Sequence, residues 1–256
     1  MSIPIGKQFI LNIIPVMFSC VALIPARAGS KRVANKNVKL LNGHPLLAYT
    51  IVAAKQAGIF TDVIVSTDSK DIAKIAEQYG ATVFGLRPAE LATDNSPDIK
   101  WVQYVLKQLM KPTDAFAILR PTSPFRQVNT IQRAWQEFST KHVDSIRAVE
   151  LCKQHPAKMW RVVDDQMEPI MSNPDLTATP WHSSPYQTLP KVYAQNASLE
   201  IAWCRIPLEQ GTISGKFIAP FFTTGYDGFD INLPEDWVVA EYLIKQHLVT
   251  LPNIVL

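Results

Sequence analysis

A short loop near the amino terminus has side chains whose types and spacing suit the binding of phosphate. Four basic residues occur within ten positions: Arg27, Lys31, Arg32 and Lys36. The small residues 28–30, Ala-Gly-Ser, lie among them. Positive charges neutralise phosphate oxygens, small residues let the backbone approach an anion closely, and a hydroxyl adds a hydrogen bond. The loop therefore predicts a nucleotide site, whereas the plain alternative for any basic segment is a solvated surface loop.

The order of the residues around this loop favours the nucleotide interpretation and also limits it. Residues 20–24 form an apolar run that predicts a buried strand, and ligands collect at the carboxyl ends of such strands. The sequence IPARAGSK, residues 24–31, lacks the Walker A spacing Gly-x-x-x-x-Gly-Lys-Ser/Thr and the Rossmann spacing Gly-x-Gly-x-x-Gly. A generic ATPase or a dehydrogenase is therefore disfavoured.

The composition of the 256-residue chain is that of an ordinary globular enzyme. It is 47% hydrophobic and 18% charged with a formal net charge of +3, which suits one large α/β core with a small appendage. No long Lys/Arg block is visible, so nucleic acid is not an expected partner. The three cysteines are widely spaced in apolar surroundings, which predicts neither disulfides nor a zinc site and fits a reducing cytoplasm.

The apolar run that follows Lys7 resembles a secretory signal ending near Cys20. Cleavage there would leave the strand of the phosphate loop at a new terminus, and a nucleotide-using enzyme outside the cell would lack its substrate. We therefore expect residues 1–16 to be an extension without a role in the fold, with translation beginning naturally at Met17. No other apolar run reaches membrane-spanning length, so no membrane partner is expected.

Helix and strand patterns alternate along the chain after the loop. Helices are expected over 44–57 and around 72–79, 99–109 and 131–138, and strands over 62–66, 81–84, 115–119 and 143–149. This series predicts an α/β fold with a mainly parallel sheet flanked by helices. Prolines then break the chain into short segments, which predicts an inserted β-rich lobe over about 151–201 within a single domain of residues 17–256. The chain returns to the core at Asp230, and Pro234 begins a last helix.

Several motifs, taken in order, resemble the acylneuraminate (CMP-sialic acid) cytidylyltransferases. The segments are IPARAGSK with Lys36 and Asn37, VSTD at 65–68, LRPAELATD at 86–94, RPTSPF at 120–125, QNAS at 195–198 and DINLPEDW at 230–237. The resemblance spans residues 21–241, and its specificity lies in the order of the motifs. It implies a nucleotide-diphospho-sugar transferase type fold, which is Rossmann-like, and a homodimer whose inserted lobe reaches the partner's sugar site. It also implies cytoplasmic transfer of CMP from CTP to the anomeric hydroxyl of a sugar acid, with release of pyrophosphate.

The resemblance assigns the nucleotide side of the site to particular residues. Arg27, Lys31 and Asp230 are expected to be catalytic, because phosphoryl transfer needs charge neutralisation and alignment more than a protein nucleophile. Contacts with CTP are expected from Ala26, Gly29, Ser30, Lys36, Asn37, Arg87 and Asp94. A surface salt bridge is the alternative for Arg87, and a tight turn at the sheet edge can coexist with a ligand-binding role for RPTSPF.

The acceptor side departs from the family pattern. Contacts with the sugar acid are expected from Arg120, Tyr186, Gln187, Gln195, Asn196 and Glu200. Arg120 stands where the family often has glutamine, Glu200 where tyrosine is usual, and Tyr186 and Ala194 where arginines are usual. These differences change charge and hydrogen bonding where the sugar should lie. A legionaminate, a pseudaminate or another nonulosonate is therefore as good an expected acceptor as N-acetylneuraminate.

The predicted metal ligands also depart from the family pattern. Mg²⁺ is the expected cofactor, held by Asp230 and Asn232 together with the triphosphate. The family pattern is commonly Asp-x-Asp, and an amide in second place brings an oxygen ligand without negative charge. The alternative is that Asn232 caps the following helix.

Two other functions remain open on the sequence alone. A glycosyltransferase of related fold would use a nucleotide sugar, but the triphosphate-type loop and the absence of an internal Asp-x-Asp motif disfavour it. A nucleotide-binding pseudoenzyme is suggested by Asn232 and Ala194. A catalytic dyad within residues 181–184, Trp-His-Ser-Ser, is disfavoured because no Gly-x-Ser-x-Gly elbow surrounds it.

Overall fold

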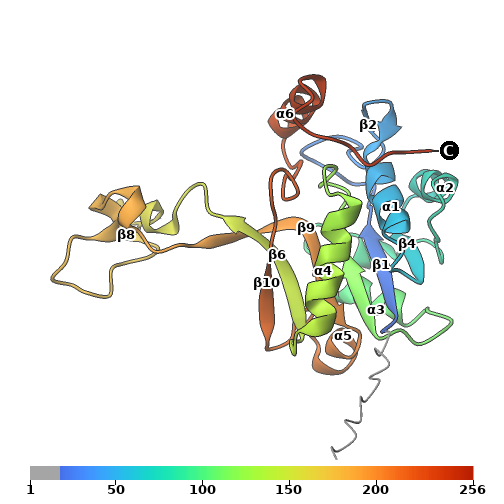
Figure 1. Ribbon diagram of the computed structural model, residues 1–256, viewed down its shortest axis with the longest axis horizontal. Coiled ribbons are helices and arrows are strands. Elements are labelled where there is room, and N and C mark those ends of the chain that lie inside the picture. The colour runs from blue at the N-terminus through green and yellow to red at the C-terminus, as the bar shows by residue number, and fades with distance from the viewer. Residues whose placement is uncertain (1–17, 256) are drawn as a thin grey trace, which may run out of the picture.

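The computed structural model describes residues 18–255, so the expectation for residues 1–16 lies outside the described part of the chain. Its centre is a six-stranded sheet in the order β10-β6-β9-β5-β1-β4 (Figure 1). The strands are β1 (Cys20–Pro25), β4 (Asp62–Ser66), β5 (Ala115–Ile118), β6 (Ser145–Leu151), β9 (Tyr193–Trp203) and β10 (Ile218–Phe222). The β1–β4, β1–β5 and β6–β10 pairs are parallel, and β9 runs antiparallel to both of its neighbours. The predicted, mainly parallel α/β sheet is confirmed.

Helices cover both faces of the sheet. They are α1 (Leu46–Ala57), α2 (Lys70–Gln78), α3 (Asp98–Leu106), α4 (Val128–Thr140), α5 (Arg205–Gln210) and α6 (Pro234–Lys245). Ala22 and Ile24 of β1 pack with α1, α2 and α4, while Val21 and Leu23 pack with α3, because successive side chains of a strand point to opposite faces. Across residues 18–255, no helix is both long and apolar enough to cross a membrane.

The helix and strand boundaries largely follow the sequence patterns. The helix expected over 44–57 begins at Leu46, because His44–Pro45 forms the short strand β3 against β2 (Leu40–Leu41). It ends at Gly58, whose left-handed conformation (φ 68°) favours glycine. The strand expected over 81–84 is reduced to one isolated bridge, between Ile64 and Thr82.

Between β6 and β9 the chain leaves the main sheet. Strands β7 (Trp160–Val163) and β8 (Gln166–Pro169) form a separate antiparallel pair. Figure 1 shows this part of the chain standing away from the sheet, at the end of the long strands β6 and β9. The range 151–201 expected for the lobe also includes part of β9, where Leu199 and Ile201 are buried in the main core. The name lobe is used below for residues 152–192.

Candidate functional site

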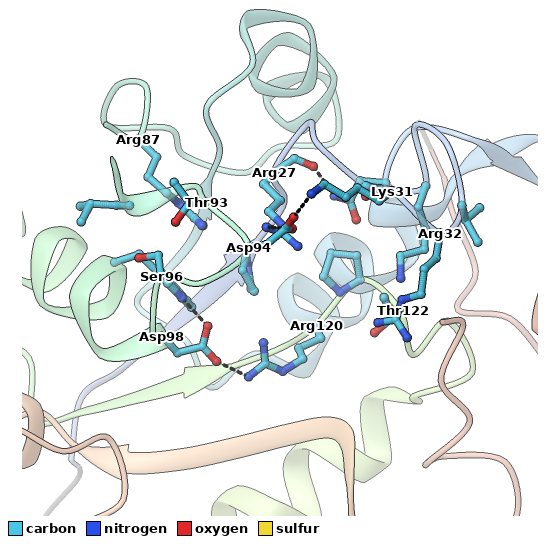
Figure 2. A pocket seen from close by; sticks show the side chains of 18 residues that line it. Arg27, Lys31, Arg32, Arg87, Thr93, Asp94, Ser96, Asp98, Arg120 and Thr122 are labelled. Atoms are coloured by element: carbon cyan, nitrogen blue, oxygen red, sulfur yellow. Dashed lines mark hydrogen bonds and ion pairs between the residues drawn. The ribbon is translucent and has the colours of Figure 1, made fainter. Parts of the chain in front are cut away.

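A cavity of about 280 Å³ opens beside the carboxyl ends of the parallel strands β1 and β5. Three stretches supply its walls, namely the loop that follows β1, the segment 87–101, and residues 120–122 after β5. Figure 2 shows their side chains converging on one space. The site residues predicted from the sequence that line this cavity are Arg27, Ser30, Lys31, Lys36, Asn37, Arg87, Asp94 and Arg120. The cavity therefore brings the predicted phosphate loop together with residues that follow it by 50 to 90 positions.

Hydrogen bonds made by the backbone of the basic loop hold the loop in place. The N–H of Ala28 donates to a carboxylate oxygen of Asp68 (2.8 Å), and the side-chain amide of Asn37 donates to the carbonyl of Arg27 (2.9 Å). The side chain of Ala26 is fully buried, and its N–H donates to the carbonyl of Ser66 (3.0 Å). Ala26 and Gly29 do not line the cavity. Asn37 and Ala26 thus shape the loop that carries the positive charges.

Asp94 lies among the positive charges of the loop. Its carboxylate is 2.7 Å from Nη1 of Arg27 and 2.5 Å from Nζ of Lys31, and Figure 2 shows both contacts. The hydrogen bond with Lys31 and the charge of Arg27 lower the pKa of Asp94 below its usual range. The side chain of Lys31 is otherwise 81% exposed. In this structure an acidic side chain occupies the position between two of the predicted phosphate-binding cations.

Arg87 is buried in the wall of the cavity. Its guanidinium donates to the hydroxyl and the carbonyl of Ser66 (3.0 and 2.8 Å) and stacks over the ring of Trp101, 5.0 Å from the centroid. Burial lowers the pKa of Arg87 to about 10, although Asp68 and Asp98 oppose this change. Arg87 makes no ion pair within 4 Å among residues 18–255, so the surface salt bridge considered for it is absent from this part of the chain.

Arg120 sits in a cluster of alternating charges. Its Nη2 is 2.6 Å from Asp98 and 3.1 Å from Glu200, and Glu200 also pairs with Arg147 (3.0 Å). Burial alone would lower the pKa of Arg120, but the two carboxylates overcome this effect and raise it. Arg120 therefore keeps its positive charge, and its ion pairs with Asp98 and Glu200 fix its position.

A fully buried arginine supports the backbone beneath this cluster. The guanidinium of Arg126 donates to the carbonyls of Arg120 and Ser198 and to the hydroxyl of Thr50. Burial lowers the pKa of Arg126 to about 9, although Asp227 opposes this change. Since Ser198 belongs to β9 and Thr50 to α1, Arg126 ties the turn after β5 to two neighbouring elements.

The predicted metal residues lie next to the basic loop. Nζ of Lys36 donates to the carbonyl of Ile231 (2.7 Å), one residue after Asp230. The side-chain amide of Asn232 donates to Oδ2 of Asp230, whereas Oδ1 of Asp230 is buried without a hydrogen-bond partner in the described part of the chain. Asn232 does not cap α6, because Leu233 is in the capping position and the carboxylate of Asp236 accepts the N–H groups of both residues.

The geometry around Asp230 fits a magnesium ion that is also coordinated by the phosphates of a nucleotide. Among residues 18–255, no group of three or more His, Cys, Asp or Glu side chains could hold a metal ion. Mg²⁺ sites at nucleotides commonly use only one or two carboxylates, because the phosphates and waters complete the coordination. A buried carboxylate oxygen without a partner, beside a loop that can bind phosphate, agrees with such a site.

Five of the residues predicted to contact the acceptor do not line the cavity, although one of them, Glu200, pairs with Arg120. Gln195 pairs with Val149 in the main sheet, and the side chain of Asn196 donates to the hydroxyl of Thr223 (2.8 Å). Tyr186 and Gln187 lie in a short 3-10 helix of the lobe, Tyr186–Thr188, where the Tyr186 hydroxyl donates to a backbone carbonyl within the lobe (2.6 Å). The single chain thus places Arg120 at the cavity, Glu200 behind it as an ion-pair partner, and the other four residues elsewhere.

Three residues of the site were missed by the sequence analysis, namely Asp98, Trp101 and Arg126. Asp98 and Trp101 line the cavity, and the indole of Trp101 donates to Asp98 (2.8 Å). Their spacing of three residues at the beginning of α3, directly after a proline, was the available signal. Arg126 follows the RPTSPF segment directly, but its burial depends on packing that no local pattern indicates.

Known proteins resemble this chain in fold and in sequence. The fold is shared with a solved CMP:2-keto-3-deoxy-manno-octonic acid synthetase, which is 13% identical, has a TM-score of 0.66, and covers 90% of this chain and 99% of that chain. A "CMP-N,N'-diacetyllegionaminic acid synthase" of Legionella pneumophila is 37% identical over 231 residues, 88% of this chain and 95% of that protein. An "N-acylneuraminate cytidylyltransferase" of Escherichia coli is 42% identical over 145 residues, which are 57% of this chain and 34% of that protein.

The family match and the full-length relative define a nucleotidyltransferase. The family described as "Cytidylyltransferase" matches residues 21–211, and the chain belongs to this family, with relatives named as acylneuraminate cytidylyltransferases and CMP-legionaminic acid synthases. The resemblance inferred from the motifs is confirmed.

Proposed function

We propose that this protein transfers CMP from CTP to the anomeric hydroxyl of a nonulosonic acid and releases pyrophosphate. The observation that carries the proposal is the convergence of five basic side chains in one cavity, namely Arg27, Lys31, Lys36, Arg87 and Arg120. One end of this cavity offers cations for a triphosphate, and the other offers an arginine for a carboxylate. The family membership and the 37% identical relative support the same reaction.

The basic loop would bind the β- and γ-phosphates. Arg27 and Lys31 exchange the carboxylate of Asp94 for phosphate oxygens, and Lys36 approaches from the side of Asp230. Cations that are already in position stabilise the pyrophosphate as negative charge develops on it. The hydroxyl of Ser30 and the backbone of the loop orient the leaving group.

Arg87 would hold the cytosine ring, and Arg120 would hold the carboxylate of the acceptor. The guanidinium of Arg87 is fixed on Trp101 and Ser66, so it presents its remaining N–H groups in a defined plane. Arg120 keeps its charge between Asp98 and Glu200 and can still donate through Nη1 and Nε. These contacts place the acceptor hydroxyl in line with the α-phosphate, which is the main requirement of the reaction.

Mg²⁺ is the proposed cofactor, with Asp230 and the side-chain oxygen of Asn232 as its protein ligands. When bound, the ion would neutralise charge on the triphosphate. The protein's own part, among residues 18–255, is to leave Oδ1 of Asp230 without a hydrogen bond beside Ile231, whose carbonyl accepts from Lys36.

The protein is proposed to act in the cytoplasm as a homodimer through its lobe. Apolar side chains of the lobe are strongly exposed in the single chain, including Val162, Met167, Ile170 and Leu176. An exposed apolar surface of this kind is typical of a subunit contact. Tyr186 and Gln187 of one subunit would then reach the acceptor in its partner.

The test is pyrophosphate release from CTP and Mg²⁺ with N,N'-diacetyllegionaminic acid, pseudaminic acid, N-acetylneuraminic acid and 2-keto-3-deoxy-manno-octonic acid. The name of the relative that is 37% identical over 88% of this chain makes N,N'-diacetyllegionaminic acid the first expected acceptor. Release with at least one nonulosonic acid supports the proposal. If CTP binds and no acid supports release, the chain is a nucleotide-binding pseudoenzyme.

A further inference from the structure

One carboxylate joins the two ends of the cavity. Oδ1 of Asp98 accepts the indole N–H of Trp101 (2.8 Å), and Oδ2 accepts a guanidinium N–H of Arg120 (2.6 Å). Figure 2 shows the carboxylate of Asp98 pointing toward Arg120. Each oxygen is therefore engaged by a different residue of the cavity wall, and the proposed function assigns Asp98 no contact with either substrate.

On the nucleotide side, Asp98 acts through Trp101. The indole is almost fully buried in α3, and its ring carries the guanidinium of Arg87 at 5.0 Å from the centroid. A stacked guanidinium follows the plane of the ring beneath it. The hydrogen bond from Trp101 to Asp98 thus sets the orientation of the group that faces the nucleotide.

On the acceptor side, Asp98 acts through Arg120. The two N–H groups of Nη2 are used by Asp98 and Glu200, so a ligand carboxylate meets Nη1 and Nε instead. Movement of Asp98 would rotate the whole planar guanidinium, because its donors are rigidly linked. The position of the acceptor therefore depends on the same carboxylate as the plane of Arg87.

Asp98 is also in the charge state that this role needs. Burial would raise its pKa, but the charge of Arg120 and the hydrogen bonds from Arg120 and Trp101 overcome burial and lower it. The carboxylate is therefore ionised at neutral pH, and both of its oxygens are acceptors.

We propose that Asp98 is a positioning residue that couples the nucleotide and acceptor ends of the cavity, an inference that rests on the proposed function. In-line transfer requires the α-phosphate and the acceptor hydroxyl to be held at a fixed mutual position, and small errors in that position are costly. A single rigid carboxylate that fixes Trp101 and Arg120 together supplies this constraint.

Two substitutions at position 98 distinguish the effect of Asp98 on acceptor binding from its effect on nucleotide binding. In Asp98→Asn the amide oxygen still accepts from Trp101, but its NH₂ group faces the donors of Arg120. We expect the KM for N,N'-diacetyllegionaminic acid to rise about tenfold, and the Kd for CTP measured by calorimetry to change less than about twofold. In Asp98→Ala both contacts are lost, and we expect both constants to rise. Glu200→Gln is the matched charge deletion, and it should raise the acceptor KM alone.

The sharpest test of coupling is Trp101→Phe. This variant keeps an aromatic face under Arg87 but removes the N–H that holds Asp98, and Trp101 itself contacts neither Arg120 nor Glu200 through a hydrogen bond. Coupling predicts that the acceptor KM rises severalfold, by about the effect of one lost hydrogen bond. Thermal unfolding of each variant shows that it is folded, and Asp98→Asn with Trp101→Phe suffices where Asp98→Ala does not fold.

The outcomes distinguish this inference from the proposed function. An active wild-type protein whose acceptor KM is unchanged in Trp101→Phe, or in which Asp98→Asn raises the Kd for CTP as much as the acceptor KM, overturns the coupling alone. A wild-type protein that transfers CMP to none of the acids overturns the proposed function, and the coupling fails with it.

Discussion

The carboxylate of Asp94 lies 2.7 Å from Nη1 of Arg27 and also pairs with Lys31. This acid therefore occupies the place proposed for the triphosphate, and CTP must displace it. A ligand that competes with an internal anion binds more weakly than the cations alone would allow. The exposed position of the pair keeps the effect modest, because solvent screens such contacts.

Replacing Asp94 by asparagine should strengthen the binding of CTP. Removal of the competing charge frees Arg27 and Lys31, so we expect the Kd for CTP from calorimetry to fall about threefold at low salt. Glu90→Gln is the control, because it removes one negative charge from the same segment at an exposed position. Weaker binding in Asp94→Asn than in the control would show that Asp94 contributes to CTP binding instead.

Replacing Lys31 by alanine should impair turnover more than folding. Its side chain is mostly exposed, so little stability depends on it, whereas a positioned cation at a leaving group typically contributes about 100-fold in rate. The measurements are pyrophosphate release and thermal unfolding, with the exposed Lys74→Ala as the control. Near-normal pyrophosphate release in Lys31→Ala would remove Lys31 from the catalytic residues.

The affinity for CTP should fall as pH rises through the pKa of Lys36. Burial lowers this pKa, although the charge of Asp230 opposes the change, so Lys36 loses its proton at a lower pH than an ordinary lysine. The protonated form binds phosphate, and the loss therefore lies on the alkaline side. Lys36→Arg should extend binding to higher pH, because arginine stays protonated. An identical alkaline limit in both proteins would mean that another group sets it.

Replacing Asn232 by aspartate should lower the Mg²⁺ concentration that half-maximal pyrophosphate release requires. A second carboxylate next to Asp230 adds negative charge to the proposed metal site. Without Mg²⁺ the two acids repel each other, so the same variant should melt at a lower temperature and should regain stability when Mg²⁺ and CTP are added. A requirement for Mg²⁺ that does not change would indicate that position 232 is not a ligand.

Replacing Arg126 by methionine should destabilise the protein. Methionine fills a similar space but leaves the acceptors of Thr50, Ser198 and Arg120 without their donor, a loss of about 3 kcal/mol in the free energy of unfolding. Urea unfolding measures this change. Arg161→Met is the control, because among residues 18–255 the exposed Arg161 pairs only with the exposed Glu168, and its substitution should cost less than about 1 kcal/mol. Equal stability of the two variants would contradict a supporting role for Arg126.

Local sequence patterns predicted most of the elements that build the site. The strand before the loop, the end of α1 at Gly58 and the beginning of α6 at Pro234 all depend on residues close together in the sequence. Strand β9 was not predicted as part of the main sheet, because its place between β5 and β6 depends on long-range pairing. The prolines before it also suggested that the separate lobe continued to residue 201.

Residues of the candidate site that belong to sequence motifs were predicted. Residues whose place depends on tertiary packing were missed. The basic loop, Arg87 and Arg120, which line the cavity, were singled out because they belong to ordered motifs. The pairing of Asp94 with Lys31 joins residues 63 positions apart, and the link from Asp98 to Arg120 joins residues 22 positions apart. No periodic pattern in the sequence indicates these contacts, so only the structure reveals them.

The most direct test of the proposed reaction is the identification of its product. The protein is incubated with CTP, Mg²⁺ and N,N'-diacetyllegionaminic acid, and mass spectrometry follows the nucleotide while a coupled assay follows pyrophosphate. We expect a CMP-linked sugar acid and pyrophosphate in equal amounts, with far less of both when UTP or ATP replaces CTP. Pyrophosphate without a CMP-linked product, or no turnover with this or any other nonulosonic acid, would contradict the proposed function.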